Sequence, residues 1–507
     1  MSQWWRDAVI YQVYPRSFAD SNGDGMGDMP GIREKLPYLA KLGVDAVWLS
    51  PFYTSPMHDG GYDVADFRDV DPMFGGLADF DRMVTEAHRL GLRVIVDIVP
   101  NHCSTEHEWF KAALAAGPGS PERERFHFRD SPDGPPNNWP SIFGGPAWTQ
   151  VPDGQWYLHL FDSSQPDFNW DNPEIHAEFL DVLKFWLDRG VDGFRIDVAH
   201  GMVKEPGLPD LPEDKATELL GGSRTPYLDV DGVHEIYRAW RQVLNSYEGD
   251  RMAVAEAWVE TPERRARYVR GDELHQAFNF DLLKSDFSAT EYRKVIDAEM
   301  SMANSVGAVP TWVLSNHDRY RHVTRFGDGP LGLARARAAT LTMLALPGSS
   351  YLYQGEELGL PEVLDLPEDV LQDPVWERSG HTDRGRDGCR VPLPWKRSGP
   401  SFGFGPGDSW LPQPGDWGSL SAEAQDGTEG STLEFYREAL RLRREHRPQA
   451  LIWSEGANGD VLAFSNGALR CVTNFGDSPI RLDGEVLLSS SPLVDGQLPG
   501  NAAAWIR

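Results

Sequence analysis

The segment Gly193-Phe194-Arg195-Ile196-Asp197 places an arginine and an aspartate two residues apart in a short apolar run. Because side chains alternate across a β-strand, we expect Arg195 and Asp197 on the same face. An arginine beside a carboxyl group favours its ionised form, which is the form that a nucleophile needs. A structural ion pair would show the same pattern, so both interpretations stay open for this segment alone.

Three other apolar runs also end in acidic or imidazole side chains. They are Asp97-Ile98-Val99-Pro100-Asn101-His102, Ala255-Glu256-Ala257-Trp258 and Ser315-Asn316-His317-Asp318. In a parallel barrel, catalytic groups come from the carboxyl ends of several strands. The four ends therefore predict one site built by strands that are far apart in the chain.

Apolar runs and longer amphipathic segments alternate along most of the sequence. Helical spacing of apolar residues occurs at 32–42, 77–90 and 174–189. Eight repeats of strand and helix predict an α/β fold, a (β/α)8 TIM barrel with right-handed crossovers. The candidate strands are 9–13, 46–51, 93–99, 193–198, 252–257, 277–282, 309–314 and 349–354.

Two connections are too long for ordinary loops. Residues 103–171 are rich in Pro, Gly, Asn and aromatic residues and predict an inserted domain after the third strand. Residues 201–233 are Pro-rich and acidic, and we expect them to cap the site. Short alternating runs with Asn-Gly and Asp-Gly turns in 449–507 predict a C-terminal antiparallel β-sandwich, which leaves 1–102 and 172–448 for the barrel.

Composition and charge restrict the class of protein. A chain of 507 residues exceeds one hydrophobic core, and 40% apolar residues are typical of a globular protein. A formal net charge of -29 disfavours nucleic acid and membrane surfaces as partners. No apolar run approaches a membrane span, the start lacks a signal core, and the cysteines are few and odd in number. These features predict a cytoplasmic protein with reduced thiols, either a monomer or a homodimer.

The four strand ends, in this order, resemble the conserved regions of glycoside hydrolase family thirteen, the α-amylase family. Within that family, Gln165-Pro166-Asp167-Phe168-Asn169 is similar to a motif of the oligo-1,6-glucosidase and α-glucosidase branch. The resemblance runs from Trp4 to about Trp395 and implies that 103–171 is the family's domain B. It also implies catalysis by two carboxyl groups, one ionised and one protonated.

The resemblance assigns roles to individual residues. Asp197 is the expected nucleophile and Glu256 the expected acid/base, whose apolar strand and neighbour Trp258 should raise its pKa. Asp318 would hold sugar hydroxyls as the third carboxylate, with His102 and His317 as donors and Arg195 orienting the nucleophile. The other expected substrate contacts are Tyr62 by stacking, Asp63 on the outer hydroxyls, Phe143, Phe161 and Phe280 at the pocket mouth, and Arg386 and Arg390 at the entrance.

A loop near the N-terminus has part of an EF-hand pattern. Oxygen donors from Asp20, Asn22, Asp24 and Asp28, with the carbonyl of Met26, occupy positions 1, 3, 5, 9 and 7 of a Ca2+ loop. Gly31 stands where an EF-hand has its bidentate glutamate. We expect a structural Ca2+ ion here, with Mg2+ as the other candidate ion and a metal-free polar turn as the alternative.

These features together predict a retaining, exo-acting α-glucosidase that removes terminal non-reducing glucose from short oligosaccharides, with transglucosylation. Val198 resembles the residue of enzymes that prefer α-1,6 links, but α-1,4 and sucrose-like substrates stay open. A glucosyltransferase or trehalose-forming isomerase using the same intermediate is the first alternative. A catalytically inactive transporter subunit is disfavoured, because Asp197, Glu256 and Asp318 are all present and a membrane anchor is not seen.

Overall fold

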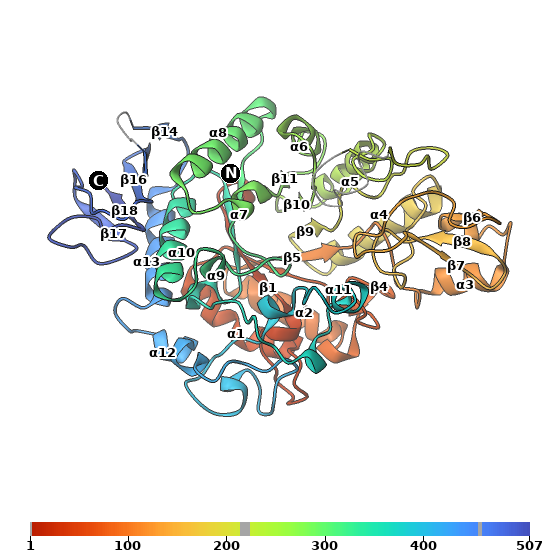
Figure 1. Cartoon of the computed structure of the whole chain (residues 1–507), viewed down its shortest axis with the longest axis horizontal. Helices are drawn as coiled ribbons and strands as arrows, with labels where there is room; N and C mark the ends of the chain where they lie inside the picture. The colour runs from red at the N-terminus through yellow and green to blue at the C-terminus, as the bar shows by residue number, and fades with distance from the viewer. Residues whose placement is uncertain (1–2, 213–223, 455–458) are drawn as a thin grey trace.

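A parallel sheet of eight strands forms the centre of the molecule. The computed structural model describes residues 3–212, 224–454 and 459–507. The strand order is β11-β10-β9-β5-β2-β1-β13-β12 (Figure 1). The two end strands, β11 and β12, are joined by a side-chain hydrogen bond, in which Thr311 Oγ1 donates to the Ala277 carbonyl at 2.6 Å. The strands are β1 (Val9–Val13), β2 (Ala46–Leu49), β5 (Arg93–Ile98), β9 (Gly193–Ile196), β10 (Met252–Ala255), β11 (Gln276–Ala277), β12 (Thr311–Val313) and β13 (Ser349–Tyr353).

This order confirms the predicted TIM-barrel fold, in which successive strands of the chain lie side by side. The prediction for the sixth strand, 277–282, was wrong in its extent. The strand β11 ends at Ala277, and α7 (Phe280–Lys284) follows at once. The Asn279 side chain caps this helix by accepting the Asp281 N–H at 3.0 Å. A short apolar run does not distinguish a strand from a buried helical turn.

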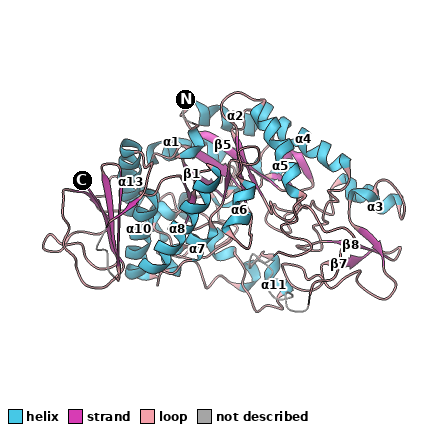
Figure 2. Cartoon of the chain, turned by 90° about the horizontal axis from the view of Figure 1, so that it is seen from above, coloured by secondary structure: helices cyan, strands magenta, loops and turns pink. Residues whose placement is uncertain are grey.

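The helices surround the barrel and agree closely with the predicted amphipathic segments (Figure 2). Helix α1 begins with the Asp28 side chain accepting the Gly31 N–H at 2.6 Å and ends at Gly43, whose φ of 99° suits glycine. The helices that cover the barrel are α1 (Met29–Leu42), α2 (Leu77–Arg89), α4 (Pro173–Asp188), α5 (Val233–Asn245), α6 (Pro262–Tyr268), α8 (Ala289–Val306), α9 (His322–Arg325), α10 (Gly329–Leu344) and α13 (Thr432–His446).

The long connection between β5 and α4 forms a separate layer at one side of the barrel (Figure 1). It contains α3 (Glu108–Ala116) and an antiparallel sheet in the order β6-β8-β7, with β6 (Phe128–Asp130), β7 (Trp148–Gln150) and β8 (Gln155–Leu158). A buried apolar cluster joins Trp139 and Trp148 of this layer to Leu208 and Tyr227 of the predicted capping segment. Residues 213–223 of that segment lie outside the described residues. The domain boundaries that we inferred from the sequence stay predictions.

The C-terminal part is an antiparallel β domain, as predicted, and its described strands form one sheet where the sequence predicted a sandwich. Its strands β14 (Ile452–Trp453), β15 (Val461–Asn466), β16 (Leu469–Asn474), β17 (Val486–Ser489) and β18 (Ala502–Ile506) form one sheet in the order β14-β15-β16-β18-β17. One face of the sheet packs on α10, where Trp505 Nε1 donates to the Leu341 carbonyl at 2.9 Å. Figure 2 shows this sheet and the β7-β8 layer at opposite ends of the molecule.

The three cysteines, Cys103, Cys389 and Cys471, are buried and unpaired. Within the described ranges, no helix is both long enough and apolar enough to cross a membrane.

Candidate active site

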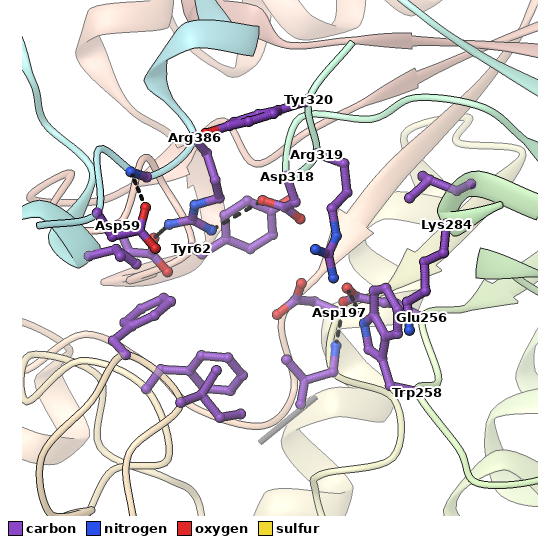
Figure 3. Close-up of a pocket in the computed structure, with 18 of the residues that line it drawn as sticks. Asp59, Tyr62, Asp197, Glu256, Trp258, Lys284, Asp318, Arg319, Tyr320 and Arg386 are labelled. Atoms are coloured by element: carbon purple, nitrogen blue, oxygen red, sulfur yellow. Dashed lines mark hydrogen bonds and ion pairs between the residues drawn. The ribbon is translucent and has the colours of Figure 1, made fainter. Parts of the chain in front are cut away.

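The ends of four barrel strands bring their polar side chains to one cavity of about 620 Å³ (Figure 3). Asp197 follows β9, Glu256 follows β10, Asp318 lies shortly after β12, and His102 follows β5. All four line the cavity, together with the predicted Tyr62, Phe143 and Phe161. The remaining lining residues include Asp59, Ile142, Val198, His200, Trp258, Leu283, Lys284, Arg319, Tyr320, Arg325, Val375, Asp383, Gly385 and Arg386.

Arg195 is buried at the centre of three carboxyl groups, which we call the carboxylate cluster: Asp97, Asp197 and Glu256. Its Nη1 lies 2.8 Å from Asp97 Oδ1 and 2.6 Å from Asp197 Oδ1, and its Nη2 lies 2.8 Å from Glu256 Oε2. The planar fork of an arginine can hold two carboxyl groups in a fixed relation. One guanidinium therefore links the two predicted catalytic residues directly.

The charge of the carboxylate cluster differs from the sequence-based expectation. Burial raises the pKa of Asp197 well above its usual value; Arg195 opposes this, but Glu256 and Asp97 raise the pKa further. Burial also raises the pKa of Asp97 to about 7, against the effect of Arg195. Arg195 thus favours the ionised form of Asp197, as the sequence predicts, but burial and two neighbouring carboxyl groups outweigh it. One positive charge cannot neutralise three buried carboxylates, so the cluster retains a proton near neutral pH.

Glu256 receives two further hydrogen bonds that fix its orientation. The Val198 N–H donates to Oε2 at 3.0 Å, and Trp258 Nε1 donates to Oε1 at 3.2 Å. Val198 has a φ of 43°, which is rare for a β-branched residue because of steric strain. This strained backbone directs its N–H toward Glu256 while its side chain lines the cavity.

Asp318 lies among cationic and imidazole groups. Arg386 Nη1 and Arg390 Nη2 are each 3.1 Å from Oδ1, and His317 Nε2 is 3.3 Å from Oδ2. Burial alone would raise the pKa of Asp318, but His317 and the two arginines outweigh it and lower the pKa. Asp318 is therefore a firmly charged carboxylate on the cavity wall.

Tyr62 and His317 form a stacked pair behind Asp318. Their rings are 5.4 Å apart at an angle of 6°, and the Tyr62 hydroxyl lies 2.6 Å from His317 Nε2. Gln12 Nε2 lies 2.7 Å from His317 Nδ1. Burial lowers the pKa of His317 to about 3, so the ring is neutral. Tyr62 lines the cavity, whereas His317 and Arg195 support it from behind.

The structure does not bring Asp63 to the cavity, so its assignment as a sugar contact is corrected. Its carboxylate accepts hydrogen bonds from Ser55 Oγ at 3.0 Å, the His58 N–H at 2.8 Å and the Asp59 N–H at 3.0 Å. Asp63 is fully buried and its hydrogen bonds hold its own loop together. Asp59, four residues earlier, lines the cavity instead.

Arg386 connects Asp59 to the rest of the site. Its Nη2 is 2.7 Å from Asp59 Oδ1, its Nε is 2.5 Å from Asp373 Oδ2, and its Nη1 reaches Asp318. Burial raises the pKa of Asp59 to about 6, and Arg386 opposes the rise. Arg390 is buried, and its Nε donates to the His317 carbonyl at 2.9 Å. Arg386 therefore faces the cavity, and Arg390 holds Asp318 from behind.

Of the predicted aromatic and imidazole residues, some line the cavity and others lie behind its wall. Phe161 packs against His102 with ring centres 5.0 Å apart, and Phe143 lies 5.6 Å from Phe161. Burial lowers the pKa of His102 to about 4, which leaves a neutral ring facing the cavity. Phe280 does not line the cavity; it stacks under Trp258 at 4.1 Å.

A buried lysine and aspartate support the His102 wall. Lys204 Nζ lies 2.8 Å from Asp167 Oδ2 and donates to Asn101 Oδ1 at 3.0 Å. Asp167 belongs to the motif Gln165-Pro166-Asp167-Phe168-Asn169, and its Oδ2 also accepts from Asn101 Nδ2 at 3.1 Å. This motif therefore ties the inserted layer to the end of β5.

The predicted metal loop is held by its own hydrogen bonds. Asp20 accepts three backbone N–H groups, from Asn22, Gly23 and Gly25, and Asp24 accepts the Met26 N–H. A Cβ on Gly31 would lie 2.2 Å from the Ala19 carbonyl oxygen, which explains why no glutamate stands there. Within the described residues, no group of three or more His, Cys, Asp or Glu side chains is arranged to hold a metal ion. The oxygen donors suit Ca2+ chemically, and the ion stays a prediction.

Several site residues escaped the sequence reasoning. Asp97 was noted only as a strand end, although it is the Cα partner of Arg195 across the β5–β9 pair. Asp59, Lys204 and Arg319 carried no signal of their own. The pairing register of the sheet, and not a sequence motif, identifies Asp97 as part of the cluster.

A TIM barrel with two linked carboxyl groups at the ends of adjacent strands, both lining one cavity, is the arrangement that a glycoside hydrolase needs. The family model "Alpha amylase, catalytic domain" matches residues 12–453. The chain therefore belongs to the alpha-amylase family, and the predicted family and enzyme class are confirmed.

Relatives with similar sequences act on glucosides. A probable alpha-glucosidase of Rhizobium meliloti (strain 1021) is 38% identical over 501 residues, which cover 94% of this chain and 90% of that protein. An oligo-1,6-glucosidase of Parageobacillus thermoglucosidasius is 37% identical, with 87% and 84% covered. The crystal structure of an alpha-glucosyl transfer enzyme matches with a TM-score of 0.90 and 37% identity over 100% of both chains.

Proposed function

We propose that the protein is a retaining, exo-acting α-glucosidase that removes terminal non-reducing α-linked glucose from short oligosaccharides. The observation that carries this proposal is the contact between Asp197 and Glu256, which share a side-chain hydrogen bond and are both held by Arg195, at 2.6 and 2.8 Å. Retention requires two carboxyl groups that are close together, because one attacks the sugar while the other protonates the leaving group. An inverting enzyme would need a wider gap for a water molecule.

In the proposed reaction, Glu256 gives its proton to the glycosidic oxygen as an Asp197 oxygen attacks the anomeric carbon. The C–O bond to the leaving group breaks and a glucosyl-Asp197 ester forms. Glu256 then takes a proton from water, which attacks the same carbon and releases glucose and free Asp197. The reaction therefore requires that the proton retained by the carboxylate cluster lies on Glu256, with Asp197 ionised, when the sugar is bound.

The proposed place of the glucose is between Tyr62, Asp59, Asp318 and Arg386. The ion pair of Arg386 with Asp59, 2.7 Å long, lies at the end of the cavity away from Glu256 (Figure 3). In this proposal the ion pair blocks that end, so that one terminal sugar fits and a longer chain does not, as exo action requires. The firmly charged Asp318 is suited to accept hydrogen bonds from ring hydroxyls as positive charge develops on the sugar.

Transfer of glucose to a sugar, as in a glucosyltransferase or trehalose-forming isomerase, is the second candidate. It is favoured by the similarity to the alpha-glucosyl transfer enzyme over the whole chain. The same glucosyl-Asp197 intermediate would serve both reactions, and only the acceptor differs. The linkage stays open between α-1,6, which Val198 favours, α-1,4 and sucrose-like substrates. We further propose a cytoplasmic monomer or homodimer, and Ca2+ in the loop 20–28 with Mg2+ as the other candidate.

The experiment that tests the proposal is incubation of the purified protein with isomaltose, maltose and sucrose, with the products followed by chromatography. Release of glucose with retained anomeric configuration, seen by proton NMR, is expected for the parent and not for Asp197→Ala. Longer oligosaccharides or trehalose as main products would favour the transferase. An inverted product, or full activity of Asp197→Ala, would refute the assigned mechanism.

A further inference from the structure

Two cationic side chains line the wall of the cavity beside Glu256. Lys284 ends α7, and Arg319 directly follows Asp318. Their charged groups lie 4.4 Å and 5.5 Å from the centre of the Trp258 ring. Figure 3 shows Lys284 and Trp258 next to Glu256, on the opposite side of Asp197 from Tyr62 and Asp59. The two cations therefore face the part of the cavity beyond the proposed glucose position.

Neither Lys284 nor Arg319 has a hydrogen-bond or ion-pair partner among the residues that the structure describes. Arg386, on the opposite wall, contacts three carboxylates within 3.1 Å. The acidic neighbour of Lys284 on its own helix, Asp281, instead lies 3.3 Å from Arg265. In a chain with a net charge of -29, unpaired cations inside a cavity are a local exception.

The remaining charged groups on this wall do not neutralise the pair. Arg325 adds a third positive charge, and it donates to the carbonyls of Ser285 at 2.8 Å and Leu314 at 2.9 Å. Asp383 also lines the cavity, and it accepts the Gly385 N–H at 2.9 Å. We call Lys284, Arg319 and Arg325 the leaving-group wall; beside these three cations, the cavity lining carries the carboxyl groups of Glu256 and Asp383.

We propose that the leaving-group wall recognises an anionic group, a phosphate or a carboxylate, on the aglycone or acceptor sugar. This inference rests on the proposed function, which places the leaving group next to Glu256. Anions are repelled by the protein as a whole, so a local pair of exposed cations is what would allow one to bind. Lysine and arginine both pair with phosphate and carboxylate oxygens.

A purely structural role makes a different prediction. Cations above an indole ring stabilise it by a cation–π interaction, and Lys284 and Arg319 could merely position Trp258. In that case, their replacement would change the handling of neutral and anionic sugars by the same factor. Arg319 could also act only on the charge of the carboxylate cluster. Its replacement would then shift the pH profile of activity equally for neutral and for anionic sugars.

The test is competition against hydrolysis of p-nitrophenyl α-glucoside by glucose, glucose 6-phosphate and glucuronate. For the parent protein, we expect at least one anionic sugar to inhibit at a concentration about tenfold lower than glucose, the size of one partly screened ion pair. Lys284→Met and Arg319→Met should each reduce that ratio toward one, whatever their effect on turnover. Lys396→Met, an exposed lysine outside the cavity, is the matched control and should keep the parent ratio.

Glucose 6-phosphate and glucuronate distinguish a site for phosphate from a site for any anion. Inhibition by glucose 6-phosphate alone assigns a phosphate, and inhibition by both assigns any anion. Equal inhibition by all three sugars, or a ratio unchanged in both variants, would overturn the inference. Failure of the parent to hydrolyse p-nitrophenyl α-glucoside would instead count against the proposed function. Calorimetric binding of the three sugars to Asp197→Ala then still decides whether the wall prefers anions.

Discussion

Asp59 and Asp63 offer a sharp test of the site, because they lie in the same loop. Replacing Asp63 should mainly reduce stability, whereas replacing Asp59 should mainly reduce activity. Asp63 accepts three hydrogen bonds within 3.0 Å and does not line the cavity. Each hydrogen bond to a charged group contributes about 1.5 to 3 kcal/mol. Asp63→Ala should therefore lower the free energy of unfolding by about 4.5 kcal/mol or more.

Asp59 lines the cavity and its carboxylate pairs with Arg386 at 2.7 Å. Its proposed contact with the sugar is a charged hydrogen bond, whose loss costs about 1.5 to 3 kcal/mol, or roughly 10- to 150-fold in kcat/KM. Arg386 retains Asp373 and Asp318 as partners, so Asp59→Ala should reduce the stability far less than Asp63→Ala.

The assays are urea unfolding followed by tryptophan fluorescence, and kcat/KM for p-nitrophenyl α-glucoside measured at a temperature where both variants are folded. Asp59→Asn and Asp63→Asn serve as isosteric controls that keep an acceptor oxygen. The reasoning fails if Asp63→Ala is as stable as the parent but loses activity, or if Asp59→Ala remains fully active.

Three further predictions concern specificity, pH and the metal loop. Val198→Ala should reduce the ratio of kcat/KM for isomaltose to that for maltose by about tenfold, the scale of one small apolar contact; an unchanged ratio would remove Val198 as a determinant. Burial lowers the pKa of His275 from 6.5 to about 3, so the unfolded chain binds a proton that the folded protein does not, and stability falls as pH drops below about 6.5. His275→Gln should remove about 1 kcal/mol per pH unit of that loss between pH 6.5 and 5 in urea unfolding, whereas the exposed His381→Gln should behave like the parent. After dialysis against EDTA, added Ca2+ should raise the thermal midpoint of the parent and not of Asp24→Ala; identical midpoints with and without Ca2+ would contradict a metal site.

The prediction of the barrel and its polar strand ends rested on features that are local in the chain. Strands buried on both faces appear as continuous apolar runs, and β9 and β10 are buried throughout. Parallel strands bring their carboxyl ends to one side, so Asp197, Glu256 and Asp318 were expected to meet. The sixth strand was predicted too long, since an apolar run of six residues fits a strand or a helical turn equally well.

The contents of the loops and the charge of the site needed the folded molecule. Nothing in the order Asp59-Gly60-Gly61-Tyr62-Asp63 indicates which aspartate turns inward, because backbone hydrogen bonds within the loop decide it. The partnership of Asp97 with Arg195 depends on the register of β5 against β9.

By itself, therefore, the sequence determined the periodicity of the elements, the family, and the chemical groups available at each strand end. The tertiary structure alone decided which groups share one guanidinium, which carboxyl groups have raised pKa values, and which cavity cations have no partner among the described residues. Periodicity and side-chain chemistry are properties of neighbouring residues. Charge state and accessibility depend on distances between residues that are remote in the chain and on the exclusion of water around them.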